Sequence, residues 1–131
     1  MTRRLLASAL LPLLVPGLTG GCRPADVRVQ TALDEARYPD ALAELRRIEP
    51  RLCHRRARWQ AHYALERGLA HLGVGDAYGA IRWLSAARVW QERNPELLTP
   101  IERDRLRTAW QSMGLMPGDR PLGPNREGRS E

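Results

Sequence analysis

The chain has 131 residues, a formal net charge of +6 and two cysteines, and all 21 of its basic residues are arginines. One domain is expected at this length, and two cysteines are too few for a disulfide-stapled scaffold or a cysteine-rich zinc site. Phenylalanine is absent, and Arg, Leu and Ala are the most frequent residues. β-branched residues are scarce, with three Ile in all, which argues against an all-β fold, and the composition favours helices.

The first 21 residues have the pattern of a secretory signal peptide. Arg3 and Arg4 precede an apolar run at 5–15, and small residues follow before Cys22. As a helix, this run would span about 16 Å, which is too short for a hydrocarbon core of about 30 Å. The pattern predicts a cleaved leader rather than a retained transmembrane anchor.

Residues 18–22, Leu-Thr-Gly-Gly-Cys, resemble a bacterial lipobox, in which small residues precede a cysteine that receives lipid. The resemblance implies cleavage before Cys22, diacylation of its sulfur and acylation of the new amine. The family prefers leucine three residues before the cysteine, where this chain has Thr19. Ordinary signal-peptidase cleavage at a nearby small residue is the alternative. Arg23 replaces the aspartate that retains enteric lipoproteins at the inner membrane, so the resemblance favours an outer-membrane anchor facing the periplasm.

Apolar spacing and helix-boundary residues predict five helices after the leader. Their expected spans are 25–37, 38–49, 55–72, 76–91 and 100–113. The strongest boundary signal is at the last helix, where Thr99 would be the N-cap, Pro100 the first helical residue and Glu102 the partner in a capping box.

The expected organisation is a lipoprotein signal peptide at 1–21, a helical domain at 22–114 and a flexible tail at 115–131. The tail is rich in proline and glycine and has few apolar groups to offset the entropy of ordering. Within the domain, Cys53 is expected to be a small buried apolar residue.

The second and fourth predicted helices share a pattern at an offset of 39 residues, which suggests a duplicated helical hairpin. The positions Tyr38, Ala41, Leu45 and Ile48 correspond to Ala77, Ala80, Leu84 and Ala87.

The second copy resembles a tetratricopeptide repeat, and the matching residues are Gly68, Gly75, Ala80, Leu84 and Ala87. In that family a small residue at the Gly68 position lets paired helices approach. The first copy matches less well, because a valine occupies that position and the copies are separated by about five residues more than the usual period of ~34. The resemblance implies an all-α fold of antiparallel TPR-like hairpins, with about two repeats plus a capping helix. A generic antiparallel helical bundle is the alternative.

The sequence contains no pattern typical of catalysis or metal binding, so we expect neither an enzyme nor a cofactor. His62 and Glu66 stand four residues apart on one predicted helix, but no third ligand is in register. His62 and His71 would face opposite sides of that helix.

The arginines are densest at 46–47 and 55–58. Nucleic-acid binding would require a basic face with stacking aromatics inside the cytoplasm, so nucleic acid is not an expected partner. Attraction to nearby anionic lipid headgroups is favoured over it, and a solvated arginine surface is the simplest interpretation.

The expected function is that of a membrane-anchored adaptor or assembly factor in the bacterial envelope, with pilotins for secretin rings as one version. The repeat resemblance implies a groove for an envelope protein or peptide segment, lined by Arg58, His62, Leu65 and Leu69. The alternative is a structural accessory lipoprotein of a larger envelope complex. The sequence does not predict an oligomeric state.

Overall fold

The computed structural model describes residues 24–115, which are helical and contain no strand, confirming the predicted all-α fold. The elements are α1 (Ala25–Asp34), α2 (Tyr38–Ile48), η1 (Glu49–His54), α3 (Ala57–Gly73), α4 (Ala77–Arg93), η2 (Pro95–Leu97) and α5 (Pro100–Ser112), where η denotes a 3₁₀ helix. The predicted leader, the lipidation site Cys22 and residues 116–131 of the predicted tail lie outside the described residues.

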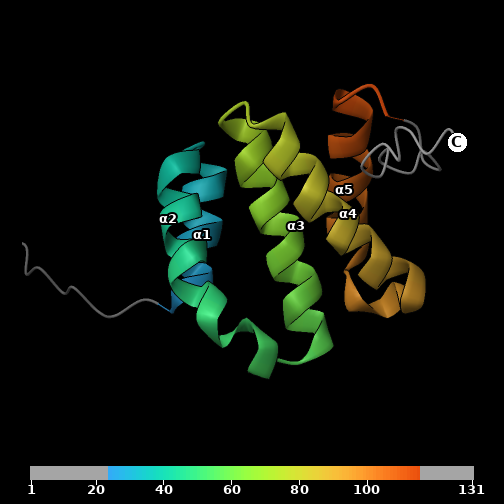
Figure 1. The fold of residues 1–131 in the computed structure, drawn as a ribbon, viewed down its shortest axis with the longest axis horizontal. Coiled ribbons are helices and arrows are strands. Elements are labelled where there is room, and N and C mark those ends of the chain that lie inside the picture. Colours follow the sequence, from blue (N-terminus) through green and yellow to red (C-terminus); the bar gives the residue numbers. More distant parts are fainter. Residues whose placement is uncertain (1–23, 116–131) are drawn as a thin grey trace, which may run out of the picture.

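Successive α-helices run in alternating directions, with α3 at the centre of the row (Figure 1). Helix α3 contacts each of the other four α-helices, and α5 packs against both α3 and α4. The order is therefore two helical pairs, α1–α2 and α3–α4, followed by a single helix. Among residues 24–115, no helix combines the length and the apolar composition that crossing a membrane requires.

Two apolar clusters lie on opposite sides of α3, because this helix is apolar around much of its circumference. The cluster shared with α1 and α2 contains Val29, Ala32, Ala41, Leu42, Leu45, Ile48, Tyr63 and Ala70. The cluster shared with α4 and α5 contains Ala61, Ala64, Leu65, Ala80, Leu84, Ala87, Leu98, Leu106, Ala109 and Trp110. Trp83 packs against both clusters. Leu115, which the predicted boundary assigns to the tail, packs against the second.

The two helical pairs bury equivalent positions at the predicted offset. Three corresponding pairs are buried on both sides, namely Ala41 with Ala80, Leu45 with Leu84, and Ile48 with Ala87. The fourth pair differs, because Tyr38 is half-buried and Ala77 is exposed. The extra residues between the copies coincide with η1, which connects α2 to α3.

Helix boundaries follow the local signals closely. The capping box is present as predicted: the Glu102 backbone N–H donates to Thr99 Oγ1 (3.2 Å), and the Thr99 N–H donates to the Glu102 carboxylate (2.6 Å). Gly75 has φ +79° in the turn between α3 and α4, a conformation that glycine adopts without steric cost. The predicted end of α1 at residue 37 is wrong, because Ala36 has φ +56° and the chain leaves the helix after Asp34.

The predicted repeat-packing residues all lie at the contact between α3 and α4 or in its turn. Ala80, Leu84 and Ala87 are fully buried. A Cβ on Gly68 would lie 2.5 Å from Leu84 Cγ, so the missing side chain sets how closely the helices approach. Gly75 contributes through its backbone in the turn.

The side chain of Arg67, on α3, makes contacts that join four elements of the fold. Arg67 Nη1 donates to the Tyr63 hydroxyl (2.6 Å) and pairs with Glu49 (2.6 Å). Its guanidinium carbon lies 4.3 Å from the Trp83 ring centroid, and the Tyr63 hydroxyl donates to the Leu45 carbonyl (3.0 Å). These contacts therefore link η1 and α2 to α3 and α4.

Replacing Arg67 by methionine is expected to lower the free energy of unfolding by about 2 kcal/mol, because a largely buried charge-assisted hydrogen bond and an ion pair are lost. The matched control is Arg82→Met. Arg82 is exposed and its guanidinium carbon lies 5.7 Å from the centroid of the same Trp83 ring, so its loss should cost less than about 0.5 kcal/mol. Urea unfolding of both variants checks the difference; equal losses would contradict this role for Arg67.

Candidate partner-binding surface

The four predicted partner-binding residues do not share one accessible surface. Arg58 is exposed and Leu69 is half-buried, but Leu65 is only 1% exposed. The prediction for Leu65 is wrong, because α5 and α4 pack over that face of α3 and enclose the side chain in their cluster. His62 lies between Arg58 and Leu69 on the helix and is held in an ionic cluster.

His62 is placed between two carboxylates from different helices. Its Nε2 lies 3.0 Å from Glu66 Oε1 on α3, and its Nδ1 pairs with Glu102 Oε1 on α5. The second Glu102 oxygen accepts the Thr99 N–H of the capping box. One side chain therefore caps α5 and ties that helix to α3. The sequence does not predict the His62–Glu102 pair, because the local pattern indicates only the capping-box role of Glu102.

The carboxylates favour the charged form of the imidazole. The contact with Glu66 raises the pKa of His62 from 6.5 to about 9, despite the opposing effect of burial, and Glu102 adds to the increase. Burial opposes ionisation of Glu102, but the hydrogen bonds from Thr99 and the pairing with His62 outweigh it and lower the pKa of that carboxyl group. The arrangement therefore favours a charged His62 ring lying between two carboxyl groups.

The stability of the domain should depend on pH through this histidine. Because the folded pKa of His62 is raised to about 9 from 6.5, the stabilisation is complete below pH 6.5 and is lost as the pH rises through 9. We expect the free energy of unfolding to fall by roughly 2–3 kcal/mol across this window. In His62→Gln the fall should be largely absent, whereas His54→Gln, at an exposed position, should keep it. Urea titrations at several pH values test this, and parallel profiles for wild type and His62→Gln would refute it.

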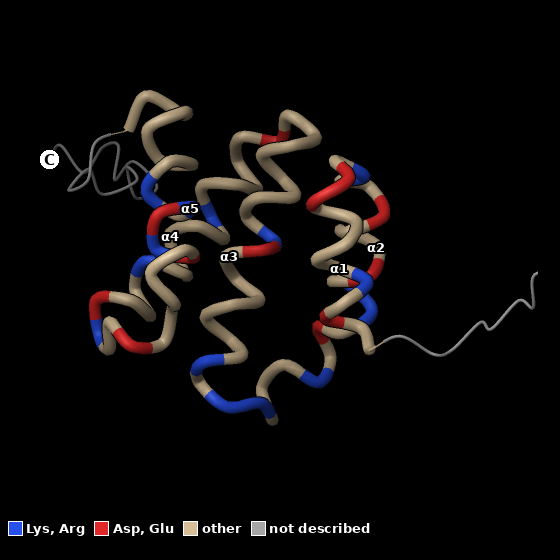
Figure 2. Tube along the Cα trace, turned by 180° about the vertical axis from the view of Figure 1, so that it is seen from behind, with Lys and Arg blue, Asp and Glu red and all other residues tan. Residues whose placement is uncertain are grey.

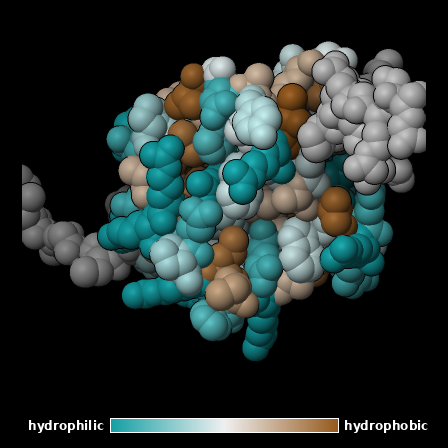
Figure 3. All heavy atoms as spheres, in the orientation of Figure 1, coloured by the Kyte–Doolittle hydropathy of each residue, from teal (hydrophilic) through white to brown (hydrophobic). Residues whose placement is uncertain are grey.

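An apolar groove runs between α3 and α5. The groove is shallow and open, with a volume of about 450 Å³, and its apolar lining comes from Leu69 and Leu72 of α3 and from Ile101 and Ala109 of α5. Its polar rim comes from α5 and consists of Asp104, Arg105, Thr108 and Ser112. Ile101, at the side of the groove, is 69% exposed. On the face seen in Figure 3, apolar residues occur in small groups separated by hydrophilic ones.

The tryptophans do not form an exposed patch. Trp110 is 4% exposed and belongs to the second cluster. Trp59, Trp83 and Trp90 are half-buried and pack against the clusters. These rings therefore serve mainly the core, and Leu69 and Ile101 are the better candidates for contact with a partner.

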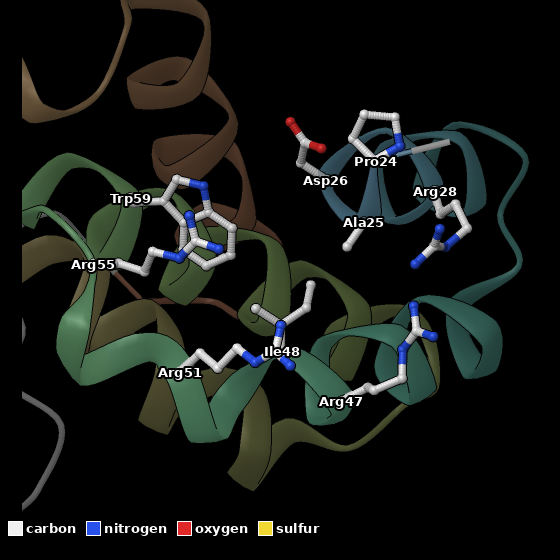
Figure 4. A pocket seen from close by; sticks show the side chains of 9 residues that line it. All are labelled: Pro24, Ala25, Asp26, Arg28, Arg47, Ile48, Arg51, Arg55 and Trp59. Carbon is white, nitrogen blue, oxygen red and sulfur yellow. The ribbon is translucent and has the colours of Figure 1, made fainter. Parts of the chain in front are cut away.

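A second recess lies at the opposite end of the row of helices, where α1, α2, η1 and α3 meet (Figure 4). Arg28, Arg47, Arg51 and Arg55 line it together with Ile48 and Trp59. The Glu44 carboxylate contacts both Arg28 (3.3 Å) and Arg47 (2.5 Å). The Arg55 guanidinium carbon lies 5.1 Å from the centroid of the Trp59 ring. Asp26 is the acidic residue of the lining, so the recess carries four arginines against one aspartate and has an aromatic wall.

The prediction that Cys53 is buried is wrong. Its side chain is exposed, because the residue lies in η1 and not on the inward face of an α-helix.

Within residues 24–115, no three His, Cys, Asp or Glu residues are placed to hold a metal ion. In the His62 cluster both ring nitrogens already face carboxylates.

Comparisons of the chain with protein-family models, with curated proteins and with solved structures find no match.

Proposed function

We propose that this protein is a lipoprotein of the bacterial envelope, anchored through Cys22 and acting as an adaptor or assembly factor for another envelope protein. The lipobox-like segment at 18–22 supports the anchor, and the arginine at position 23 supports an outer-membrane location facing the periplasm. The duplicated burial pattern and the close approach at Gly68 support a TPR-like origin of the two helical pairs. The proposal assigns the protein a binding role without catalysis.

The observation that carries the adaptor role is the apolar groove between α3 and α5. Leu69 and Leu72 supply its floor, and Ile101 stands exposed at its side. A partner segment with one or two apolar side chains would bury this surface, while Asp104 and Arg105 at the rim offer charged contacts. The predicted contact Leu69 is part of this surface.

Site-specific photocrosslinking from intact envelopes tests the adaptor role. A photoreactive residue at position 101 should form an adduct with one protein partner. The same residue at position 78 should form none, although Tyr78 is 83% exposed in the first turn of α4. Ile101→Asp should reduce recovery of that partner about tenfold or more, because it places a charge against an apolar anchor. Adducts of equal yield at both positions would favour an accessory role in a larger complex. The absence of an adduct at position 101 would refute the groove as the partner-binding site.

A further inference from the structure

We propose that the protein docks on the anionic phospholipid headgroups of its own membrane through a basic edge. This edge is formed by the end of α2, by η1 and by the beginning of α3, and its arginines are Arg46, Arg47, Arg51, Arg55, Arg56 and Arg58. The inference rests on the proposed function, because it takes Cys22 as the lipid anchor. It adds an orientation of the domain relative to the bilayer.

Charge is the first argument. All six arginines of the basic edge are exposed, and they occur within the thirteen residues 46–58. The one acidic residue in this stretch, Glu49, pairs with Arg67 of the domain interior. Glu44, just before the stretch, pairs with Arg47. Figure 2 shows the basic positions gathered at this end of the molecule, around the connection from α2 to α3. Each arginine near an anionic surface contributes favourably to binding.

The position of the anchor is the second argument. Pro24 and Ala25, at the start of the described chain, line the same recess as Arg47, Arg51 and Arg55 (Figure 4). Cys22 precedes Pro24 by two residues, which can extend by at most about 7 Å. That reach is close to the Debye length of about 8 Å at physiological ionic strength. A lipid on Cys22 would therefore hold the basic edge within electrostatic range of the headgroups.

The chemistry of the recess is the third argument. Guanidinium groups bind phosphate through paired N–H donors. Trp59 lies half-buried beside Arg55 in the same recess, and tryptophan favours the interfacial region of a bilayer. Arginine beside tryptophan near an acyl anchor fits a phosphate-bearing lipid surface.

Cys53 provides a built-in reporter for the test, because its exposed thiol lies within the basic edge. The lipidated protein is purified in detergent, its mass is checked, and it is reconstituted in vesicles of phosphatidylcholine alone or mixed with phosphatidylglycerol. The rate of alkylation of Cys53 by an uncharged, membrane-impermeant maleimide is then measured. We expect slower alkylation on the mixed vesicles only, with the difference removed by high salt. A Cys53→Ser/Tyr78→Cys variant, with its thiol away from the edge, should show equal rates on both.

A charge-matched pair of variants makes the test specific. Arg51→Gln/Arg56→Gln should lower the ratio of docked to undocked protein about thirtyfold, since each arginine contributes about fivefold at an anionic surface. Arg82→Gln/Arg93→Gln removes the same charge from exposed positions on α4 and should leave the protection of Cys53 unchanged. Equal effects of the two double variants would overturn a localised basic edge.

The outcomes separate the docking proposal from the proposed function. A lipidated chain whose Cys53 reacts equally fast on both vesicles overturns docking and leaves the anchor intact. Protection in native membranes but not in protein-free anionic vesicles also overturns it, in favour of an acidic protein partner. A mass without acyl groups, with two reactive thiols in the chain, overturns the anchor and the docking together.

Discussion

Replacing Cys22 by serine is expected to abolish incorporation of fatty acid into the protein and to move it out of the mature membrane-bound form. A serine hydroxyl does not replace the sulfur that receives the diacylglyceryl group in the lipobox family that residues 18–22 resemble. The effect should be large, because each buried CH₂ contributes about 0.8 kcal/mol and two or three chains hold a protein firmly on a bilayer. Metabolic labelling with a fatty-acid analogue and membrane fractionation measure both changes.

The matched control for this experiment is Cys53→Ser, since these are the two cysteines of the chain. Cys53→Ser should retain the lipid label and the membrane location, because its exposed thiol lies in η1 and the anchor does not involve it. Unchanged labelling and fractionation of Cys22→Ser would contradict the anchor. A wild-type protein that is cleaved at another small residue and carries no label would indicate ordinary signal-peptidase processing.

Local signals were sufficient to predict most of the helices. The capping box at Thr99 and Glu102, the positive-φ glycine at 75 and the apolar spacing depend on neighbours within a few residues. The sequence therefore allowed the order and the approximate limits of all five α-helices to be predicted. The end of α1 was misplaced because Ala36, a residue without a particular preference for positive φ, adopts the turn conformation.

The surface was predicted less well, because exposure depends on how the helices pack. Leu65 and Leu69 lie on the same helix, and the positions of α4 and α5 decide that Leu65 is enclosed while Leu69 borders a groove. The pairing of His62 with Glu102 joins residues 40 positions apart, and helical periodicity carries no information about it. The exposure of Cys53 likewise follows from the course of η1. These features belong to the tertiary structure and not to local propensity.

Substituting valine for Gly68 is expected to have the largest effect on stability among the changes considered for the helical domain. A Cβ at this position would lie 2.5 Å from Leu84 Cγ and 3.0 Å from the Leu84 backbone nitrogen. Leu84 is fully buried, and its backbone nitrogen is among the atoms that the added side chain would meet, so α3 and α4 would have to separate. Overpacking of this kind costs typically 1–3 kcal/mol, and the clash with backbone places Gly68→Val at or above about 3 kcal/mol. For a domain of this size, the melting temperature should fall by about 10–20 °C.

Two further variants show whether the loss comes from helix contact. Gly75→Ala tests backbone conformation alone, because φ is +79° there and no atom lies within 4 Å of the added Cβ; it should cost only about 1–2 kcal/mol. Combining Gly68→Ala with Leu84→Ala should cost less than the sum of the two single changes, since the smaller side chain at 84 makes room for the new methyl group. Thermal and urea unfolding measure all of these variants. Two outcomes would contradict the importance of the close approach of α3 and α4 at Gly68. One is that Gly68→Val loses no more stability than Gly75→Ala, and the other is that the losses from the Ala substitutions at 68 and 84 are simply additive.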